Sequence, residues 1–209
     1  MQHKGKLKEK VFIFDFDGTI IDSIDDIVFI LSKYIPNLTR NTLRQILVDV
    51  YIRHSTSALF KMFYAEILIF LHVNQVLKNI VEDTGKLPLI HDIQDVLIDL
   101  HKNGVKLFVV SSNFTKNIQD YLISKNLDVF ERVEGIGIIF GKARYIKAIA
   151  NTYSDSDIYY IGDDIRDVLA AKKACVKSVA VTWGLSTKED FQYVDPDYIV
   201  DQPTDLLRI

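Results

Sequence analysis

Two aspartates stand two residues apart in the segment Asp15-Phe16-Asp17-Gly18-Thr19, which directly follows the apolar run 11–14. The run is short and ends at a glycine-containing acidic segment, so it predicts a buried strand that enters a tight loop. In an extended chain the two carboxylates would face opposite ways, but a loop that begins at Asp17 can turn both toward one site. Such carboxylates can act as a nucleophile, exchange protons or bind a hard cation.

A second acidic cluster, Asp163-Asp164-Ile165-Arg166-Asp167, follows the apolar run 158–161 and Gly162. Between the two clusters the chain carries Ser111, at the end of the apolar run 105–110, and Lys142. A hydroxyl and an ammonium group beside carboxylates can bind phosphoryl oxygens, and carboxylate oxygens are the ligands that Mg²⁺ prefers. Taken alone, Ser111 would be an ordinary strand-end serine and Lys142 a solvated lysine, so their positions relative to the acids carry the argument.

The elements that must position these groups alternate along the chain. We expect strands at 11–14, 105–110, 158–161 and 178–182, and helices at 92–102, 115–125, 143–152 and 164–173, with Thr115 as an N-cap. This alternation predicts an α/β fold with a doubly wound, Rossmann-like parallel sheet that helices cover on both faces. Ligands of such sheets bind beyond the carboxyl ends of the strands, where Asp15, Ser111 and Asp163 would meet.

Residues 24–83 break the alternation and show the pattern of successive amphipathic helices. Ser23 and Asp26 resemble a capping box before the first helix, Pro36-Asn37 predicts a turn, and further helices are expected at 40–53, 58–72 and 74–82. We therefore expect two domains, an α/β core domain at 1–22 and 84–209 and a small all-helical domain inserted at 23–83. The motifs described above all lie outside this insertion.

The composition is that of an ordinary globular protein, with 48% hydrophobic and 25% charged residues among 209. The formal net charge of -3 provides no general attraction for nucleic acid or an anionic membrane, so neither is expected as a partner. The single cysteine, Cys175, excludes an intramolecular disulfide, and we expect it to be buried in a helix. Cysteine usage and the lack of a signal-peptide-like or membrane-spanning run favour a cytoplasmic protein.

In order, spacing and context these motifs resemble those of the haloacid dehalogenase superfamily, in the phosphatase branch that includes phosphoglycolate phosphatases with a helical cap. The resemblance covers nearly the whole chain, including the helical insertion and the segment 181–184. It implies that the insertion is a mobile cap over the site, with hinges near Asp22 and Leu87-Pro88.

The resemblance also implies a role for each motif residue. Asp15 would be the nucleophile that becomes an aspartyl phosphate, and Asp17 would be the general acid and then the general base. Mg²⁺ would be held by Asp15, by the backbone carbonyl of Asp17 and by Asp163. Phosphoryl oxygens would be bound by Ser111 and Lys142, and Gly18, Thr19, Ser112 and Asn113 would also contact the substrate. Asp164 and Asp167 would orient the groups around them.

The chain departs from the family pattern after Lys142, because prolines commonly follow this lysine and Ala143 stands here instead. Lys147 is therefore kept as an alternative cation. Arg53, His54 and Lys61 in the insertion are candidates for contacting the non-transferred part of an anionic substrate, although charges on helix surfaces are usually only solvated.

The expected function is Mg²⁺-dependent hydrolysis of a small phosphorylated metabolite, either a phosphomonoester such as phosphoglycolate or pyrophosphate. A sugar-phosphate mutase of the same superfamily would share every catalytic residue. A phospho-acceptor switch similar to receiver domains would also combine strand-end aspartates, a hydroxyl group and a lysine, but it would need no long helical insertion. The sequence leaves the substrate and the oligomeric state open.

Overall fold

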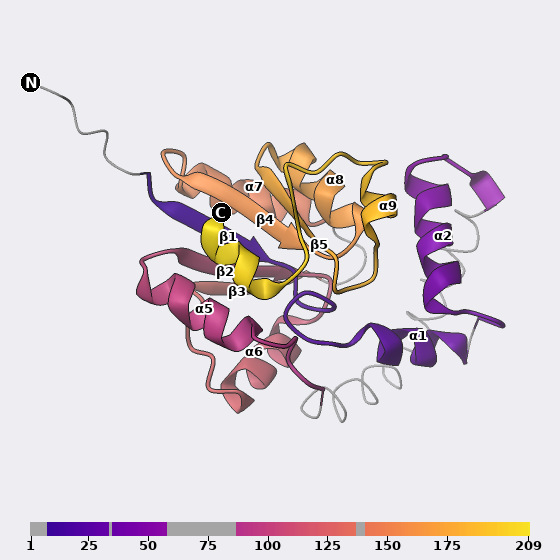
Figure 1. Cartoon of the computed structure of the whole chain (residues 1–209), viewed down its shortest axis with the longest axis horizontal. Coiled ribbons are helices and arrows are strands. Elements are labelled where there is room, and N and C mark those ends of the chain that lie inside the picture. Colours follow the sequence, from indigo (N-terminus) through magenta and orange to yellow (C-terminus); the bar gives the residue numbers. More distant parts are fainter. Residues whose placement is uncertain (1–7, 34, 58–86, 137–140) are drawn as a thin grey trace, which may run out of the picture.

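The computed structural model describes residues 8–33, 35–57, 87–136 and 141–209 (Figure 1). At its centre lies a parallel sheet of six strands in the order β3-β2-β1-β4-β5-β6. The order reverses beside β1, which has β2 on one side and β4 on the other, as in doubly wound sheets. The predicted fold class is thus confirmed, with strands β1 (Lys10–Phe14), β2 (Lys106–Ser111), β3 (Arg132–Gly135), β4 (Asp157–Gly162), β5 (Lys177–Val181) and β6 (Tyr198–Val200).

Helices cover both faces of the sheet (Figure 1). Side chains alternate along β1, so that Phe12 and Phe14 pack on one face while Val11 and Ile13 pack on the other. The first face is covered by α5 (Ile93–Lys102) and α6 (Thr115–Ser124), and the second by α7 (Ala143–Thr152) and α8 (Ile165–Ala174). Two short helices, α9 (Lys188–Phe191) and η1 (Pro203–Arg208), lie in the C-terminal part of the chain.

Three local predictions are wrong, namely the capping roles of Ser23 and Thr115 and the burial of Cys175. Ser23 precedes α1 (Ile24–Ser32) without capping it, since its hydroxyl donates to Asp17 instead. Thr115 is the first residue of α6 and not its N-cap, and its side chain bonds to Gly135 at the end of β3. Cys175 is exposed, and it ends α8 in the left-handed region with φ 60°.

The described part of the predicted insertion includes α1 and α2 (Arg40–Tyr51), with the expected turn at Pro36-Asn37 between them. The side chain and backbone of Thr39 form a capping box with Thr42 at the start of α2. These helices pack against the core: α1 and α2 contribute Ile24, Leu47 and Val48 to a buried cluster with residues of α8, β5 and the α9 region, namely Ile165, Val168, Ala180, Leu185, Phe191 and Val194. The helices expected at 58–72 and 74–82 lie outside the described residues, and the predicted domain boundaries stay a prediction.

An ion pair also joins α2 to α9. Arg44 donates from Nε to Asp190 Oδ2 at 2.7 Å and from Nη2 to Thr187 Oγ1 at 3.1 Å. Both charged side chains are largely removed from solvent, since Arg44 is 20% and Asp190 7% exposed. Burial alone would raise the pKa of Asp190, but the bonds from Arg44 and from the Thr187 N–H hold it below its usual value.

We expect Arg44→Met to lower the free energy of unfolding at pH 7 by about 1–3 kcal/mol, because Asp190 would keep its buried charge without its cation. Because the pKa of Asp190 is lowered in the folded state, its ionised form stabilises the protein at pH values above its unfolded-state pKa. This stabilisation is lost as the pH falls through the folded-state pKa. The difference between wild type and variant should therefore shrink below about pH 4. Urea unfolding at several pH values measures both effects.

The matched control is Lys116→Met, which removes the exposed pair between Lys116 and Asp120 within α6. We expect it to change the free energy of unfolding by less than about 0.5 kcal/mol, because exposed i,i+4 pairs are weak. Equal destabilisation by the two substitutions would show that the Arg44 pair does not anchor α2.

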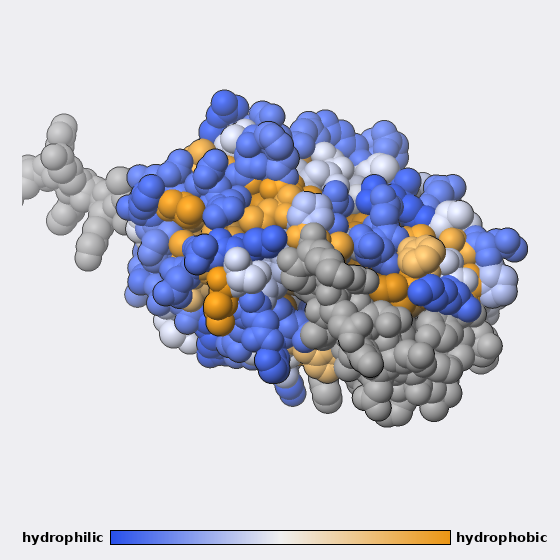
Figure 2. Space-filling view, turned by 90° about the horizontal axis from the view of Figure 1, so that it is seen from below, coloured by the Kyte–Doolittle hydropathy of each residue, from blue (hydrophilic) through white to orange (hydrophobic). Residues whose placement is uncertain are grey.

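The surface in Figure 2 is largely hydrophilic, with apolar residues in separate patches between polar ones. Large exposed apolar side chains such as Phe29 and Ile123 belong to different helices, α1 and α6. Scattered apolar residues of this kind are normal on protein surfaces. Among the described helices, none has the length and hydropathy needed to cross a membrane.

Candidate active site

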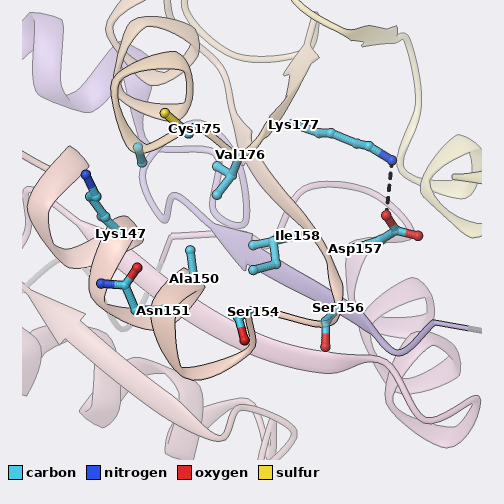
Figure 3. Close-up of a pocket in the computed structure, with 11 residues that line it drawn as sticks. Lys147, Ala150, Asn151, Ser154, Ser156, Asp157, Ile158, Cys175, Val176 and Lys177 are labelled. Carbon is cyan, nitrogen blue, oxygen red and sulfur yellow. Dashed lines mark hydrogen bonds and ion pairs between the residues drawn. The ribbon is translucent and has the colours of Figure 1, made fainter.

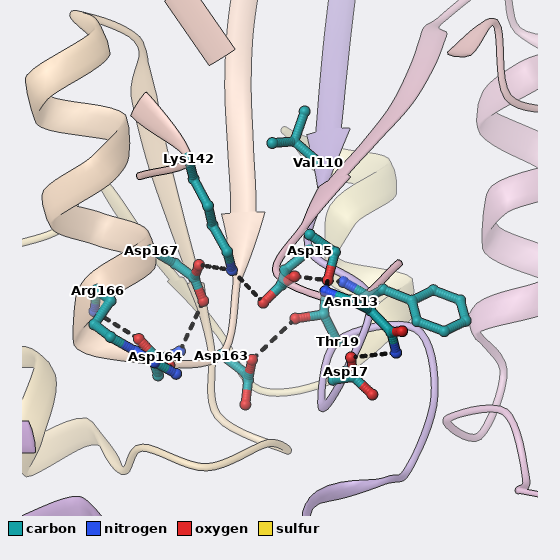
Figure 4. A network of polar contacts seen from close by, with 12 residues as sticks. Asp15, Asp17, Thr19, Val110, Asn113, Lys142, Asp163, Asp164, Arg166 and Asp167 are labelled. Atoms are coloured by element: carbon teal, nitrogen blue, oxygen red, sulfur yellow. Dashed lines mark hydrogen bonds and ion pairs between the residues drawn. The ribbon is translucent and has the colours of Figure 1, made fainter. Parts of the chain in front are cut away.

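The predicted site residues lie where the central strands of the sheet end (Figure 4). Asp15 follows β1, Ser111 is the last residue of β2, and Asp163 follows β4. The N–H of Asp15 donates to the carbonyl of Ile161 at 2.8 Å, which extends the pairing of β1 with β4. Because neighbouring parallel strands end at one edge, residues distant in the sequence face one another here.

The loop after Asp15 is a tight turn that presses against Asp163. Gly18 has φ 74°, a conformation that favours glycine, and a Cβ atom there would lie 2.3 Å from Asp163 Oδ2. Gly18 N–H donates to the carbonyl of Ile21 at 2.9 Å and Thr19 N–H to that of Phe16 at 3.3 Å, so both amides close the turn. Substrate binding by Gly18 and Thr19 stays a prediction.

Asp163 is held by the first loop and by the loop that follows β5. The Thr19 hydroxyl donates to its Oδ1 at 3.3 Å, and the Leu185 N–H donates to its Oδ2 at 2.8 Å. Trp183 Nε1 donates to the Thr19 carbonyl at 3.2 Å and links the two loops. Asp163 is 2% exposed, so these contacts fix a buried carboxylate in one orientation.

Asp15, Asp163 and Asp167 each offer a carboxylate oxygen within 4.8 Å of the others. Burial, reinforced by the carboxylates of Asp167, Asp164 and Asp15, raises the pKa of Asp163 well above its usual value. Burial also raises the pKa of Asp167 to about 7, although Lys142 acts in the opposite direction. Crowded, buried, hard oxygen ligands fit a divalent cation such as Mg²⁺, which would offset their mutual repulsion.

Asp17 lies in the same loop, but its carboxylate is bound elsewhere (Figure 4). Its Oδ1 accepts from the Ser23 hydroxyl at 2.9 Å, and its Oδ2 accepts from Asn113 Nδ2 at 3.0 Å. Burial and the charge of Asp15 raise the pKa of Asp17 to about 6. A carboxyl group of this pKa can both donate and accept a proton near neutral pH. Metal binding through the Asp17 carbonyl stays a prediction.

Lys142 occupies the space between two carboxylates of the site. Its Nζ donates to Asp15 Oδ2 at 2.6 Å and to Asp167 Oδ1 at 2.7 Å, and its side chain is 11% exposed. Burial would lower the pKa of Lys142, but Asp15 and Asp167 raise it well above its usual value. The ammonium group is therefore charged at neutral pH and partly neutralises both acids.

Lys147, the alternative to Lys142, lies elsewhere. It is exposed on α7 and lines a groove of about 450 Å³ together with Ser156, Asp157 and Cys175 (Figure 3). Asp157 begins β4 whereas Asp163 follows its end, so the groove lies at the amino ends of the strands, opposite the candidate site. The structure thus places Lys142, and not Lys147, beside Asp15.

The remaining predicted residues near the core acids have local roles. The buried Ser111 hydroxyl accepts from the Asn113 N–H at 3.3 Å, and Ser112 between them is half-buried. Asp164 caps α8 and accepts from Arg166 Nε at 2.8 Å. Its N–H donates to Asp167 Oδ2 at 3.2 Å, so Asp164 helps to orient Asp167.

The predicted contacts from the insertion are not all described. Arg53 is exposed and pairs with Asp49 at 2.7 Å, and His54 is exposed with φ 53°. Lys61 lies outside the described residues. Substrate binding by Arg53 and His54 stays a prediction.

The model of the family described as haloacid dehalogenase-like hydrolase matches residues 12–181. A phosphoglycolate phosphatase of Synechococcus elongatus is 27% identical over 95% of this chain and 96% of its own length. A phosphoglycolate phosphatase of Aquifex aeolicus is 28% identical over 96% of each chain. A haloacid dehalogenase-like protein of Streptococcus pneumoniae shares the fold with a TM-score of 0.68 at 22% identity, covering 96% of this chain and 97% of that structure.

Proposed function

This chain belongs to the haloacid dehalogenase-like hydrolase family, and we propose that it is a Mg²⁺-dependent phosphatase that acts through an aspartyl phosphate on Asp15. The observation that supports this most is the position of Asp15, which faces the ammonium group of Lys142 at 2.6 Å. The same carboxylate also belongs to the cluster with Asp163 and Asp167. A nucleophile for phosphorus needs charge neutralisation of this kind, because the phosphoryl group it attacks is itself anionic.

In the first half of the reaction, an oxygen of Asp15 forms a bond to phosphorus while the bond from phosphorus to the ester oxygen breaks. Asp17 gives its proton to the departing oxygen. In the second half, Asp17 takes a proton from water and the water oxygen bonds to phosphorus while the bond from phosphorus to the Asp15 oxygen breaks, so that inorganic phosphate leaves and the Asp15 carboxylate is restored. One carboxyl group serves both halves, since the donor in the first is ready to accept in the second.

The other residues would bind and neutralise the phosphoryl group. Ser111 and Lys142 would contact its oxygens, with interactions that strengthen as charge develops in the transition state. Mg²⁺, held by Asp15, the Asp17 carbonyl and Asp163, would supply positive charge next to the phosphoryl oxygens. Asp167 would keep Lys142 in place, as its 2.7 Å contact indicates.

The substrate class proposed is a small phosphomonoester, with 2-phosphoglycolate as the first candidate. The support for it comes from the curated relatives, which include phosphoglycolate phosphatases of Synechococcus elongatus and Colwellia psychrerythraea and match nearly the whole chain. These relatives also favour hydrolysis over the reaction of a mutase, which would return the phosphoryl group to the sugar. A mutase would use the same catalytic residues.

The test is release of inorganic phosphate from a panel of phosphomonoesters and pyrophosphate, with and without Mg²⁺. We expect turnover that requires Mg²⁺, is lost on chelation and is highest for a small phosphomonoester. Asp163→Asn should weaken Mg²⁺ binding, measured by calorimetry, by at least about 10-fold.

The control is Asp157→Asn, at the other end of β4, which should leave Mg²⁺ binding unchanged. Full turnover after exhaustive chelation, or equal Mg²⁺ affinity in the Asp163 and Asp157 variants, would contradict the proposal.

A further inference from the structure

Tyr160 is a buried polar residue beside the site to which the mechanism above assigns no role. It belongs to β4, is 1% exposed and packs in the apolar layer that faces α7 and α8. Its hydroxyl donates to the carbonyl of Val110 at 2.9 Å and lies 3.4 Å from Asp167 Oδ1. Lys142 Nζ lies 5.9 Å from the centre of its ring.

The hydroxyl of Tyr160 reaches across the central strand of the sheet. Val110 belongs to β2, Tyr160 belongs to β4, and β1 lies between these two strands. The bond therefore ties the ends of β2 and β4 together at the level of Asp15, and Val110 directly precedes Ser111. One phenol thus contacts the strand that carries Ser111 and the acid that binds Lys142.

The single proton of the hydroxyl has two neighbouring acceptors, Val110 and Asp167. The Val110 carbonyl is nearer by 0.5 Å, the difference between 2.9 and 3.4 Å, and it takes the proton. Lys142 Nζ and the phenol oxygen approach the same Asp167 Oδ1, at 2.7 and 3.4 Å, so the phenol oxygen keeps its lone pairs on the side of Asp167 and Lys142. Burial raises the pKa of Tyr160 well above its usual value while Lys142 acts against this rise, so the phenol keeps its proton.

The backbone of Lys142 is fixed at the start of α7, where its carbonyl accepts from the N–H groups of Tyr145 and Ile146 at 3.0 Å, but its long side chain needs support of its own. It is the N-cap of α7, it follows the exposed Gly141, and Ala143 comes after it. A long lysine side chain loses considerable rotamer freedom when it is fixed. Its two carboxylate partners lie on different elements, because Asp15 follows β1 and Asp167 lies in the first turn of α8, and each would draw the ammonium group toward itself.

We propose that Tyr160 is a positioning residue that fixes the ammonium group of Lys142 between Asp15 and Asp167, with its own hydroxyl proton directed to Val110. The inference rests on the proposed role of Lys142 in binding the phosphoryl group. A tyrosine that served only the packing of the core would affect stability and leave Lys142 where it is.

The test compares Tyr160→Phe with Tyr159→Phe, its neighbour on β4. Both substitutions remove one oxygen from the same strand, but the Tyr159 hydroxyl faces Lys177 Nζ at 3.3 Å, and its ring packs in the other core layer. We expect kcat/KM to fall by about 10-fold to 100-fold in Tyr160→Phe, the range seen when partners that orient a site group are removed. Tyr159→Phe should stay within about 2-fold of wild type.

The second readout is the ¹⁵N NMR signal of the lysine ammonium groups, recorded without substrate. A buried, hydrogen-bonded ammonium exchanges slowly with water, and the Lys142 signal is assigned by its loss in Lys142→Met. We expect this signal to vanish in Tyr160→Phe and to persist in Tyr159→Phe. Persistence of the signal in Tyr160→Phe, with kcat/KM near that of wild type, would overturn the proposal.

The NMR experiment separates this proposal from the proposed function. If the wild-type protein released no phosphate from any substrate, the function would be refuted. Even then, a Lys142 signal that is lost in Tyr160→Phe and kept in Tyr159→Phe would still support positioning of Lys142 by Tyr160.

Discussion

Asp15→Asn is expected to abolish both phosphate release and covalent phosphorylation of the protein. An amide is a far poorer nucleophile than a carboxylate, and it is a weaker ligand for a hard cation. The substitution also removes the charge that Lys142 contacts at 2.6 Å, so the ammonium group loses one of its two carboxylate partners. In a hydrolase that forms a covalent intermediate, loss of the nucleophile costs on the order of a million-fold in kcat. Steady-state phosphate release and phosphoenzyme formation measure the two effects.

The matched control for Asp15→Asn is Asp157→Asn, which makes the same chemical change at the opposite edge of the sheet. Its partner there is Lys177 at 3.4 Å, outside the proposed site. We expect near-wild-type turnover in this variant. Turnover of Asp15→Asn within about 10-fold of wild type would rule out a nucleophilic role for Asp15.

Asp17→Asn is expected to accumulate phosphoenzyme when the substrate has a good leaving group, such as an aryl phosphate. Attack on such a substrate needs no proton donor, whereas hydrolysis of the intermediate still needs a base. Asparagine has nearly the shape of aspartate, and its carbonyl oxygen can still accept a hydrogen bond from Ser23 or Asn113. The hydrolytic step should slow by about 100-fold to 10,000-fold, which quench-flow experiments on a single turnover measure directly.

Alkyl phosphates provide the internal control for the Asp17 variant. Their leaving groups need a proton, so in Asp17→Asn the first step should also slow and little phosphoenzyme should form. The ratio of first-step rates for aryl and alkyl phosphates should therefore increase relative to wild type. An unchanged ratio, with no phosphoenzyme on either substrate, would show that Asp17 is not the proton donor.

The parts of the fold that could be predicted are those with a long, regular pattern. The buried strands around 11–14 and 158–161 stop abruptly at polar residues, and the parallel arrangement then brings Asp15 and Asp163 to one edge. Strands β3 and β6 were not predicted, because both are short edge strands with charged or exposed residues. Their patterns do not differ from those of loops.

Contacts that the folded chain creates explain why other parts of the site could not be predicted. Leu185 binds Asp163 through its backbone N–H, a group that nearly every residue type has, so the residue type does not reveal this contact. Ser23 has the sequence pattern of a helix cap, yet its hydroxyl is taken by Asp17. The sequence predicts Tyr160 only as one more buried strand residue. Its bond to Val110 depends on the strand order, which places β2 two strands away from β4. The partners of Leu185 and Tyr160 depend on how distant segments pack, and that of Ser23 depends on the conformation of the loop after β1.

The packing of α1 and α2 also bears on the proposed cap. The resemblance implies that 23–83 moves as a cap, but Arg44 pairs with Asp190 and Leu47 packs in a cluster with Leu185 of the core. Leu185 in turn bonds to Asp163. A movement of α2 away from the core would have to break these contacts next to a proposed metal ligand. We therefore expect α2 to stay with the core on any timescale shorter than that of local unfolding.

The most direct test of the mechanism is acid-quenched intact-protein mass spectrometry of the wild type, Asp15→Asn and Asp17→Asn after mixing with an aryl phosphate and Mg²⁺. One added phosphoryl group should appear transiently in the wild type and persist in Asp17→Asn. Peptide mapping should place it on Asp15, and Asp15→Asn should show none. A phosphoryl group that still appears in Asp15→Asn, or that maps to Ser111 or Asp163, would contradict the assignment of Asp15 as the nucleophile.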